Sequence, residues 1–595
     1  EREVIVDSVI PTDMRRLPLA GHLGMRMLPD VIAALDPTIS TLVFTNTRSQ
    51  AERWFHAILV AKPEWAGITA LHHGSIDREA REAVEAGLKN GTLKIVVATS
   101  SLDLGVDFSP VERVMQIGSP KGVGRLMQRA GRASHRPMQP CRVTCVPTHG
   151  LELFEIDAAR RAIATGHIEP RTPASKPLDV LAQHMVTCGL GGGFDVDALY
   201  EEVRTAWSYR ELSREEFDWA LALVVNGGGT LAAYPDYHRV GLVEGRYRVP
   251  KQRIAQLHRL NIGTIVADST VDIRYLSGKR LGRIEENFVG NLRVDERFVF
   301  AGKTVSFVMM KDMTAYVKPA RGNTTYTPIW GGTKLPISES LAASIRDALE
   351  KAGAGEEAQS PEVRAAAGIV ATQQRLSRIP GADEMLMEVT ATSEGTHLFV
   401  FPFDGRMVHG GMAAILALRL SRLKSGTFLI SVNDYGFEIL SAGEYPFDSL
   451  LSPAMFAPDR LVEDAYESIN MSALAKLQFR EVARVSGLVL QTYPGTTKSR
   501  RQTQAGAGLL FDVLSEFDPG NLLLHQARRE VMDRHFEESR LARTMRRVSS
   551  ARHILVRTER FTPLSFPLVI ERQSAKLSSQ SILERVEAIR DEWGI

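Results

Sequence analysis

The sequence has 595 residues, of which 44% are hydrophobic and 24% are charged, and these values are ordinary for a globular protein. This length is enough for three or four domains, each with a core of its own. No run of 18 or more apolar residues occurs, so we expect no membrane-spanning segment. A net charge of only +2 excludes a basic field of the whole chain as an argument for a polyanionic partner.

The three cysteines, Cys141, Cys145 and Cys188, form neither a CxxC pair nor a quartet of metal ligands. This spacing predicts a cytoplasmic protein without disulfides and without a structural metal. The chain opens on Glu1 and a strand-like EVIVDSVI segment, and it shows no charged-then-apolar signal region. We therefore expect a piece of a longer protein that was cut between domains.

Basic residues outnumber acidic ones in three segments near the C-terminus, namely 498–501, 528–529 and 534–560. Such clusters contact phosphates in many proteins that bind nucleic acid, but a solvated helix face explains each of them equally well.

Residues 1–169 predict a RecA-like α/β domain with a parallel sheet. Short β-branched runs alternate there with helical stretches, which is the pattern of consecutive βαβ units. The expected strands are 41–45, 68–73, 94–99, 113–118 and 142–146.

Residues 170–261 predict a winged-helix domain. A proline-punctuated linker at 170–177 opens it, with Ser175 as a candidate helix cap, and Ser213 with Glu216 forms a capping box before a later helix. Three helices followed by a hairpin-like segment at 240–250 are typical of this fold.

Residues 262–595 are expected to form one accessory domain. Its first part, 262–335, is rich in strands and glycine turns and predicts a barrel-like sheet. Residues 336–595 mix helices with strands and end in arginine-rich helices. The chain therefore combines α/β with α+β domains.

The segment QRAGRASHR in the first domain is the strongest chemical signal. An ATPase needs arginines beside a stable turn, because they stabilise the charge on the transferring phosphoryl group. We name Gln128, Arg129 and Arg132 as candidate catalytic residues.

Three further segments of this domain place polar residues at the ends of strands, where they suit phosphates and ribose. Each segment alone is more often an ordinary loop between a strand and a helix. The candidates for contact with a nucleic-acid strand are Thr45, Arg48, His73, Ser75, Thr99, Ser100 and Ser101. The candidates for contact with a nucleotide are Gly105 and Asp107.

Taken together and in this order, the four segments resemble motifs IV, IVa, V and VI of superfamily-two helicases. The resemblance implies that Arg129 and Arg132 act toward ATP as sensors or arginine fingers. One departure matters, because GRASHR stands where many relatives have GRxGR. His135 thus stands where many relatives have a second arginine finger, and Arg136 directly follows. The sequence leaves open whether Arg132 or Arg136 is the main finger, and Arg136 is also a candidate for nucleotide binding.

The two motifs that hydrolyse ATP in such motors are missing from the sequence. It contains no GxxxxGK[ST] loop to hold phosphates and no DExH box to hold magnesium. Its one GKT, at 302–304, has strand-like residues on both sides. We expect that a first motor domain is absent and that this chain alone does not hydrolyse ATP.

Beyond the linker, five segments resemble the Lhr, or large helicase-related, family, and the likeness extends over almost the whole chain. These segments are 297–307, 326–332, 399–422, 432–440 and 509–531. The resemblance implies domains that encircle single-stranded nucleic acid, and a tryptophan, here Trp330, that stacks on a base. The length beyond the motor domain resembles the shorter bacterial branch that is associated with DNA-repair ligases.

We therefore expect the rear part of a 3′ to 5′ helicase that acts in DNA repair. Its expected cofactors are ATP and Mg²⁺, shared with the missing motor domain. Its expected partners are single-stranded DNA, a DNA or RNA:DNA duplex, and a DNA-repair ligase or nuclease, with no membrane. The alternative is a nucleic-acid-binding scaffold or a processing enzyme whose accessory domain has an activity of its own.

Two weaker constellations carry no function in this interpretation. His184 and Cys188 stand four residues apart on an expected helix, where packing is a better explanation than half of a metal site. Asp404, His409 and Asp434 lack a recognisable nucleophile, so they are expected to be structural.

Overall fold

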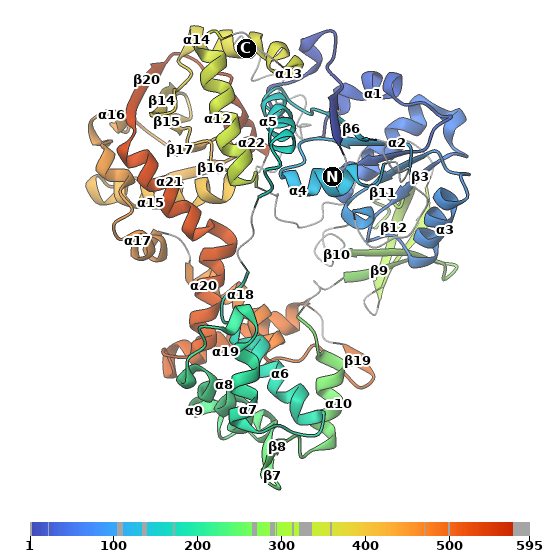
Figure 1. Ribbon diagram of the computed structural model, residues 1–595, viewed down its shortest axis with the longest axis vertical. Coiled ribbons are helices and arrows are strands. Elements are labelled where there is room, and N and C mark those ends of the chain that lie inside the picture. Colours follow the sequence, from blue (N-terminus) through green and yellow to red (C-terminus); the bar gives the residue numbers. More distant parts are fainter. Residues whose placement is uncertain are drawn as a thin grey trace. The chain divides into compact units, whose positions relative to one another are not determined.

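The computed structural model describes residues 3–21, 23–103, 111–133, 140–169, 173–264, 270–285, 292, 294–311, 314–320, 336–356, 360–468, 471–497 and 500–574. The chain forms two compact units (Figure 1). The first comprises Glu1–Glu169, Thr270–Leu461 and Ser539–Ile595, and the second comprises Pro170–Ser269 and Val462–Glu538. Among the described residues, no helix is both long enough and apolar enough to cross a membrane.

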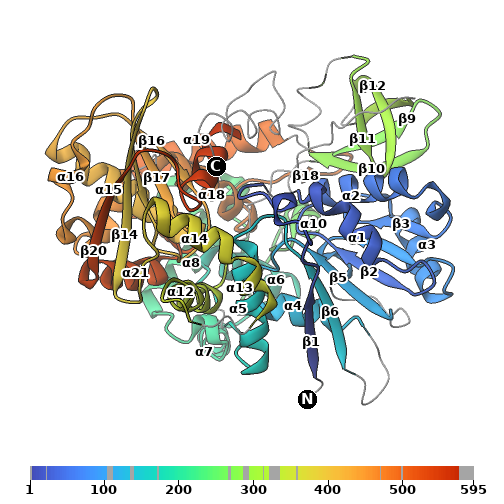
Figure 2. The same cartoon turned by 90° about the horizontal axis from the view of Figure 1, so that it is seen from above.

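The first unit begins with a six-stranded sheet in the order β1-β6-β5-β2-β4-β3, and every neighbouring pair is parallel. Figure 2 shows these strands side by side, from β1 at one edge to β3 at the other. The strands are β1 (Val4–Ser8), β2 (Thr41–Phe44), β3 (Thr69–His72), β4 (Ile95–Ala98), β5 (Arg113–Ile117) and β6 (Cys141–Val146). The helices are α1 (Leu28–Ala34), α2 (Arg48–Ala61), α3 (Arg78–Lys89), α4 (Val123–Ala130) and α5 (Glu152–Ala164).

The predicted RecA-like α/β domain is confirmed, because each of the five expected strands is present. All residues of β2 and β4 are buried, as expected for central strands of a parallel sheet that is covered on both faces. Trp54 of α2 and Phe44 of β2 are among the largest fully buried side chains of the core.

A five-stranded sheet of the same unit follows in the order β10-β9-β13-β12-β11. Its strands are β9 (Thr270–Tyr275), β10 (Arg280–Glu285), β11 (Arg297–Phe300), β12 (Lys303–Lys311) and β13 (Thr314–Pro319). All its pairs are antiparallel except β9 with β13. We call it the small sheet; it has its own core, which includes Val271, Phe298 and Val305.

The rest of the first unit is built on a second five-stranded sheet, in the order β16-β17-β15-β14-β20, which we call the C-terminal sheet. Its strands are β14 (Glu384–Thr392), β15 (Gly395–Val400), β16 (Phe428–Val432), β17 (Phe437–Ser441) and β20 (Arg552–Thr558). The helices are α12 (Glu339–Gly353), α13 (Pro361–Ala365), α14 (Ala367–Leu376), α15 (Arg406–Leu423), α16 (Phe447–Leu450), α21 (Glu538–Ser550) and α22 (Phe566–Ser574). Helices α12 and α13 pack on α5 of the RecA-like domain.

The second unit contains the winged helix, with the expected hairpin formed by β7 (Gly241–Val243) and β8 (Arg246–Arg248). Its first helices are α6 (Leu178–Leu190), α7 (Val196–Arg204), α8 (Arg214–Asn226), α9 (Gly228–Leu231) and α10 (Gln252–Asn261). The capping box of Ser213 and Glu216 is present at the start of α8. The expected cap at α6 differs, because Pro177 occupies the N-cap position and no side chain caps the helix there.

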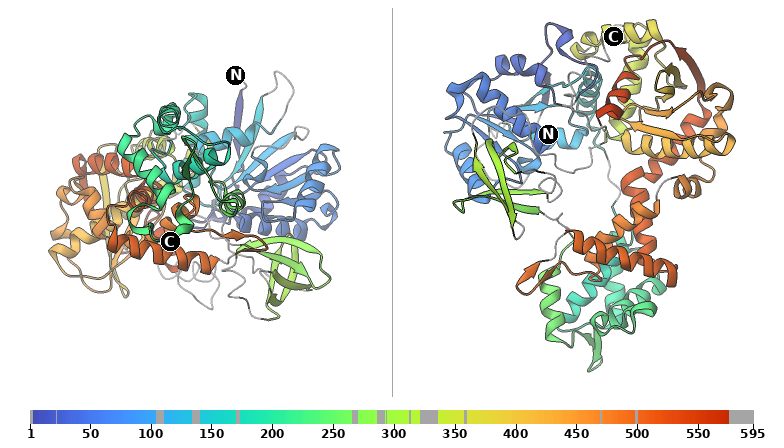
Figure 3. Two further views of the ribbon diagram at one scale, coloured as in Figure 1. Left: turned by 90° about the horizontal axis from the view of Figure 1, so that it is seen from below. Right: turned by 180° about the vertical axis from the view of Figure 1, so that it is seen from behind.

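The second unit also contains a late segment of the chain, and this differs from the expectation of one accessory domain over 262–595. The late elements are α17 (Leu461–Ser468), α18 (Met471–Val485), β18 (Thr492–Tyr493), β19 (Thr496–Thr497), α19 (Arg500–Phe517) and α20 (Leu522–Phe536). Figure 3 shows α18 to α20, in orange, against the green helices of the winged helix. Phe479 and Leu524 share one core with Leu181 and Met185, so the apolar faces of these late helices are buried by α6.

Candidate functional site

Arg129, near the end of α4, is held inside the RecA-like domain. Its side chain is 1% exposed, and its guanidinium donates to the carboxylate of Asp103 at 2.9 Å and to the side-chain oxygen of Gln116. The guanidinium also lies 4.8 Å from the centre of the Phe44 ring. Burial lowers the pKa of Arg129, and the charge of Asp103 opposes this effect. The arginine therefore fixes α4 against the ends of β4 and β5.

The other two candidate catalytic residues lie nearer the surface. Gln128 is exposed, whereas Arg132 is half-buried and its Nε donates to the main-chain oxygen of Asp103 at 3.2 Å. Asp103, in the segment that follows β4, thus binds both arginines. The remaining nucleotide candidates, Gly105, Asp107 and Arg136, lie outside the described residues.

The candidates for strand contact divide by exposure. The side chains of Arg48 and Ser100 are exposed, and they lie at the starts of the segments that follow β2 and β4. Thr45 and Thr99 are buried, with exposed fractions of 0% and 6%. Ser101 is half-buried, and its Oγ lies 2.8 Å from Nδ1 of His72. Arg48 and Ser100 are therefore the members of this group that are exposed, and Ser101 is exposed in part.

His73 and Ser75, the candidates that follow β3, are buried in this structure, with exposed fractions of 0% and 5%. Nε2 of His73 lies 3.0 Å from a carboxylate oxygen of Glu52 on α2, and Nδ1 accepts the main-chain N–H of Ser75 at 3.3 Å. Both ring nitrogens of His73 are thus engaged within the protein, and the imidazole does not reach the surface.

Glu52 also explains the GKT sequence at 302–304. Its carboxylate accepts the main-chain N–H groups of Ala301 and Gly302 at 2.6 and 2.7 Å. These two residues form the tight turn between β11 and β12, and both have positive φ angles, of 50° and 71°. The structure therefore identifies this GKT as part of a hairpin whose turn binds a carboxylate of the protein.

The small sheet is attached to the RecA-like domain by main-chain contacts as well. The N–H of Arg283 donates to the oxygen of Ser75 at 2.8 Å, and the N–H of Asp77 donates to the oxygen of Leu281 at 3.1 Å. Gly282 lies between them, and a Cβ there would overlap the Ser75 oxygen. The segment after β3 thus serves as the docking edge for β10.

Trp330 lies outside the described residues. The chain is described again from residue 336, and Ile337 is fully buried beside the loops that precede α15 and follow β16. Ile337 is therefore a fixed point of the C-terminal part of the first unit.

The histidines of the two weaker constellations contact other groups of the protein. Sγ of Cys188 lies 3.4 Å from Nε2 of His184, and the described residues contain no group of three or more potential metal ligands. His409 is fully buried and bonds the main chain at Asp404 and Asn433. Burial lowers the pKa of His409 to about 4, so the imidazole is neutral at physiological pH.

Several residues that organise this site were not predicted from the sequence. Gln116 is a polar residue within the apolar strand β5, and Asp103 and Glu52 are acidic residues at buried positions. A buried polar side chain needs partners, so a polar residue inside an apolar strand is a usable signal. For Glu52 the partners come from Ala301 and Gly302, and no local pattern connects them.

Three family models match separate parts of the chain. The model of the helicase conserved C-terminal domain matches residues 25–136. The model of the winged helix domain of the large helicase-related protein matches residues 161–327, and the model described as DEAD/H associated matches residues 379–565.

Related proteins match along most of the chain. ATP-dependent helicase Lhr-Core protein 2 of Thermococcus barophilus is 28% identical over 550 residues, which is 89% of this chain and 63% of that protein. ATP-dependent helicase Lhr-Core of Methanocaldococcus jannaschii is 26% identical over 586 residues, which is 96% of this chain and 68% of that protein. The chain thus spans about two thirds of the length of these relatives.

A solved structure has the same fold over nearly the whole chain. The structure of Mycobacterium smegmatis helicase Lhr bound to ssDNA and AMP-PNP has a TM-score of 0.72 and 23% sequence identity, and it covers 95% of this chain and 71% of its own. The three models, the relatives and this fold agree, and the chain belongs to the Lhr family of superfamily-two helicases.

Proposed function

We propose that this chain supplies the second motor domain and the strand-binding domains of an ATP-dependent helicase. The protein moves 3′ to 5′ along single-stranded DNA and unwinds DNA or RNA:DNA duplexes. The observation that carries the proposal is the arrangement at the end of α4, where Arg129 and Arg132 are both bound by Asp103 in the segment after a central strand of an all-parallel sheet. The names of the relatives, which are ATP-dependent helicases, support it.

On the nucleotide side, Arg132 stabilises the charge of the transferring phosphoryl group and Gln128 acts beside it. Arg129 is a positioning residue, because its guanidinium is bound to Asp103 and Gln116. Gly105, Asp107 and Arg136 complete this half of the site in the proposal. The phosphate loop and the acidic pair come from a further motor domain, because the sequence given contains neither.

Mg²⁺ belongs to that other half of the site. The described residues offer no group of three or more potential metal ligands, so the residues present do not fit a metal site of their own. No step of the proposed mechanism on this side passes through the ion.

On the nucleic-acid side, Arg48 and Ser100 contact phosphates through their side chains. The segments of Thr45, His73, Ser75, Thr99 and Ser101 take part through their main chain, since most of these side chains are buried. Trp330 stacks on an unpaired base, which is worth about 1–3 kcal/mol in single-strand binders. Work in DNA repair beside a ligase or a nuclease is part of the same proposal and rests on the resemblance to the shorter bacterial branch.

The test compares ATP hydrolysis by this chain with hydrolysis by a longer protein that includes the preceding reading frame, with and without single-stranded DNA. We expect no hydrolysis by the chain alone and strand-stimulated hydrolysis by the longer protein. Hydrolysis by the chain alone would contradict the proposal of a shared site.

Arg132→Ala in the longer protein should lower kcat for ATP by about a thousandfold, as is typical of an arginine finger. The matched control is Arg142→Ala, because Arg142 is an exposed arginine of the same domain that pairs with Asp7 of β1 and has no part in the proposed mechanism. Equal rates for Arg132→Ala and Arg142→Ala would remove Arg132 from the mechanism.

A further inference from the structure

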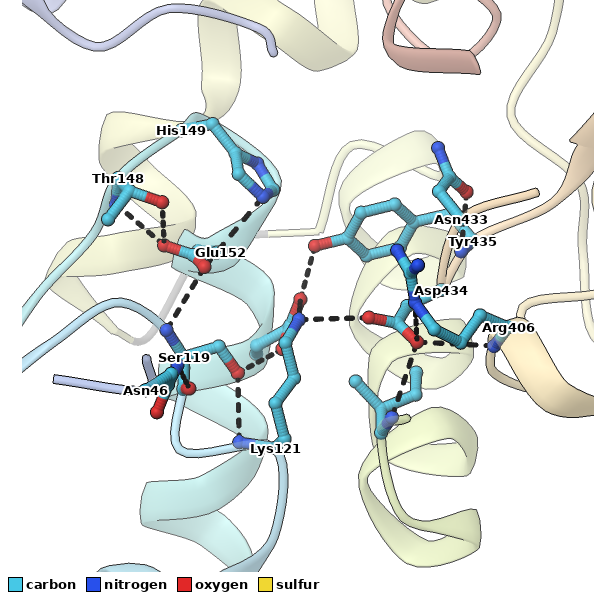
Figure 4. Close-up of polar contacts among 12 residues, drawn as sticks. Asn46, Ser119, Lys121, Thr148, His149, Glu152, Arg406, Asn433, Asp434 and Tyr435 are labelled. Carbon is cyan, nitrogen blue, oxygen red and sulfur yellow. Dashed lines mark hydrogen bonds and ion pairs between the residues drawn. The ribbon is translucent and has the colours of Figure 1, made fainter. Parts of the chain in front are cut away.

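Lys121 lies in the loop between β5 and α4, two residues before the helix that carries Gln128 and Arg129. Its ammonium group contacts two buried carboxylates, Glu155 of α5 at 3.1 Å and Asp434 of the β16–β17 turn at 3.0 Å (Figure 4). One end of this bridge is therefore in the RecA-like domain, and the other is in the part of the unit built on the C-terminal sheet.

On its own side of the bridge, the carboxylate of Asp434 binds main-chain amides of two separate chain segments. Its carboxylate accepts the main-chain N–H of Ile337 at 3.3 Å and that of Arg406 at 3.1 Å. The N–H of Ser338 in turn donates to the main-chain oxygen of Lys121 at 3.1 Å. Consecutive amides at 337 and 338 are thus bound by Asp434 and by Lys121 itself.

The RecA-like side of the bridge continues to the strand-contact segments. Ser119 donates its hydroxyl to Glu155, and its main-chain oxygen accepts the side-chain N–H of Asn46 at 2.6 Å. Asn46 immediately precedes the segment of Arg48 at the start of α2. Tyr435 donates its hydroxyl to Glu155 from the other side, so the carboxylate is held by both parts of the unit.

The charges in this network are balanced although they are buried. Lys121 is 16% exposed at its side chain, and Glu155 and Asp434 are 0% and 5% exposed. Burial alone would raise the pKa of Asp434, but Lys121 and Arg406 outweigh it and lower this pKa to about 2. Burial favours neutral Lys121, yet Asp434 and Glu155 raise its pKa above the ordinary value. Both groups stay ionised, so a separation of the two parts would leave buried charges without their partners.

We propose that Lys121 is a positioning residue that couples movement of α4 during ATP use to the part of the unit built on the C-terminal sheet. Lys121 precedes α4 by two residues. A shift of the loop before α4 therefore acts on the amide of Ser338 directly and on the amide of Ile337 through Asp434. This inference rests on the proposed helicase function and adds a physical route from the motor domain to the C-terminal sheet.

A second contact between the same two parts provides a matched control. Arg160 of α5 donates to the carboxylate of Glu362 on α13 at 2.9 Å, and this carboxylate is 0% exposed. The pair joins α5 to the same C-terminal part as Lys121 does, but it lies on α5 and α13 instead of the loop before α4. A variant that weakens this pair tests whether any weaker contact between the two parts has the same effect.

The experiment uses the longer protein and compares Lys121→Met/Asp434→Asn with Arg160→Met/Glu362→Gln. Each double variant removes one positive and one negative charge, so neither leaves a new net charge. For each protein, the ATP hydrolysed and the base pairs unwound are measured in the same reaction, together with binding of a single strand. Wild-type protein that fails to hydrolyse ATP or to unwind would contradict the proposed function and not the route through Lys121.

We expect the Lys121 and Asp434 variant to unwind roughly two- to thirtyfold fewer base pairs per ATP, the range of coupling effects of single positions. Its kcat for ATP and its strand binding should stay within about twofold of wild type, and the Arg160 and Glu362 variant should keep the wild-type ratio. An unchanged ratio in the Lys121 and Asp434 variant would overturn the inference, as would equal losses in both double variants.

Tyr435→Phe provides a milder test should the double variant not fold. It removes the hydroxyl that donates to Glu155 and keeps the ring. The control is Tyr445→Phe, because Tyr445 is also buried and its hydroxyl bonds main-chain oxygens of Leu420 and Lys424 at 2.9 Å within the C-terminal part. A lower number of base pairs per ATP only in Tyr435→Phe supports the route, and equal ratios in the two variants overturn it.

Discussion

The two units of the molecule each use a buried aspartate to join segments that are far apart in the sequence, but the aspartates have different partners. In the first unit, Asp434 faces the cations of Lys121 and Arg406, which lower its pKa to about 2. In the second unit, Asp179 at the start of α6 accepts the side-chain N–H of Gln526 on α20 at 2.6 Å. Burial raises the pKa of Asp179 to about 6, with nearby Glu530 adding to the effect.

The two aspartates differ in whether nearby cations compensate their negative charge. A buried carboxylate with cations beside it stays ionised over the physiological range, and its contact persists as a balanced ion network. A buried carboxylate whose described partner is a neutral amide takes up a proton close to neutral pH. The contacts of Asp434 should therefore be strong and insensitive to pH. The contribution of Asp179 to the stability of the second unit should fall as pH rises.

The largest effect is expected for Asp434→Ala. The substitution leaves Lys121 with one carboxylate fewer and removes the acceptor of the Ile337 and Arg406 amides. Loss of one partner from a buried ion network costs about 3–5 kcal/mol. Hydrogen exchange at these two amides measures the loss as a lower free energy of opening.

The control for Asp434→Ala is Asp347→Ala. Asp347 of α12 pairs with Arg161 across the contact of α5 and α12 and with Lys351 of its own helix, but its side chain is 41% exposed. Exposed ion pairs contribute about 1 kcal/mol or less. Equal losses for the two variants would contradict the importance of burial at Asp434.

The second effect concerns pH and the second unit. The pKa of Asp179 is raised to about 6 from an ordinary value of 3.8, so the unfolded chain releases this proton at lower pH than the folded unit. The free energy of unfolding that this pKa shift contributes is fully present below pH 3.8 and is lost as pH rises through 6. A shift of two pKa units corresponds to about 3 kcal/mol.

Asp179→Asn should remove this loss, because an asparagine oxygen can still accept from Gln526 and from the Val180 amide. The free energy of unfolding of the variant should equal that of the wild type near pH 4 and exceed it by about 3 kcal/mol at pH 7. Denaturant unfolding at the two pH values measures this. Parallel pH profiles of the two proteins would show that Asp179 does not titrate in this range.

The smallest effect is expected at Glu52, whose carboxylate is compensated by main-chain amides. Glu52→Gln replaces one acceptor oxygen by an NH₂ group, so the amide of Ala301 or of Gly302 loses its partner. A buried donor without a partner costs about 1–3 kcal/mol. Faster hydrogen exchange at these two amides is the readout.

Glu85→Gln is the matched control for Glu52→Gln. Glu85 bonds the neighbouring histidine His72 at 3.1 Å, but its side chain is 28% exposed, so water can replace the lost contact. Exchange at Ala301 and Gly302 should stay at the wild-type rate. A change there of the same size in Glu85→Gln would show that the hairpin turn does not depend on Glu52.

The sequence predicted the RecA-like domain correctly because its information is local. Apolar and β-branched runs in β2 and β4 indicate buried strands, and their alternation with helical stretches indicates a parallel sheet. The capping box at Ser213 is local in the same sense. The family could be recognised because its motifs are short and continuous.

The environment of the site residues could not be predicted in this way. Arg129 and His73 belong to motifs that indicate contact with ligands, yet the structure buries both side chains against Asp103 and Glu52. A motif gives the type of a residue and its position along the chain, but exposure depends on which distant segment covers it.

By itself, the sequence determined that this protein contains a parallel α/β domain with the motifs of a superfamily-two motor and a winged helix. Only the tertiary structure decided that residues 462–538 join the winged helix and that Lys121 meets Asp434. The physical reason is that an apolar helix face or a buried charge needs a partner, but the local sequence does not indicate which distant segment provides it. Lys121 and Asp434 lie more than 300 residues apart, and folding of the whole unit brings them within 3.0 Å.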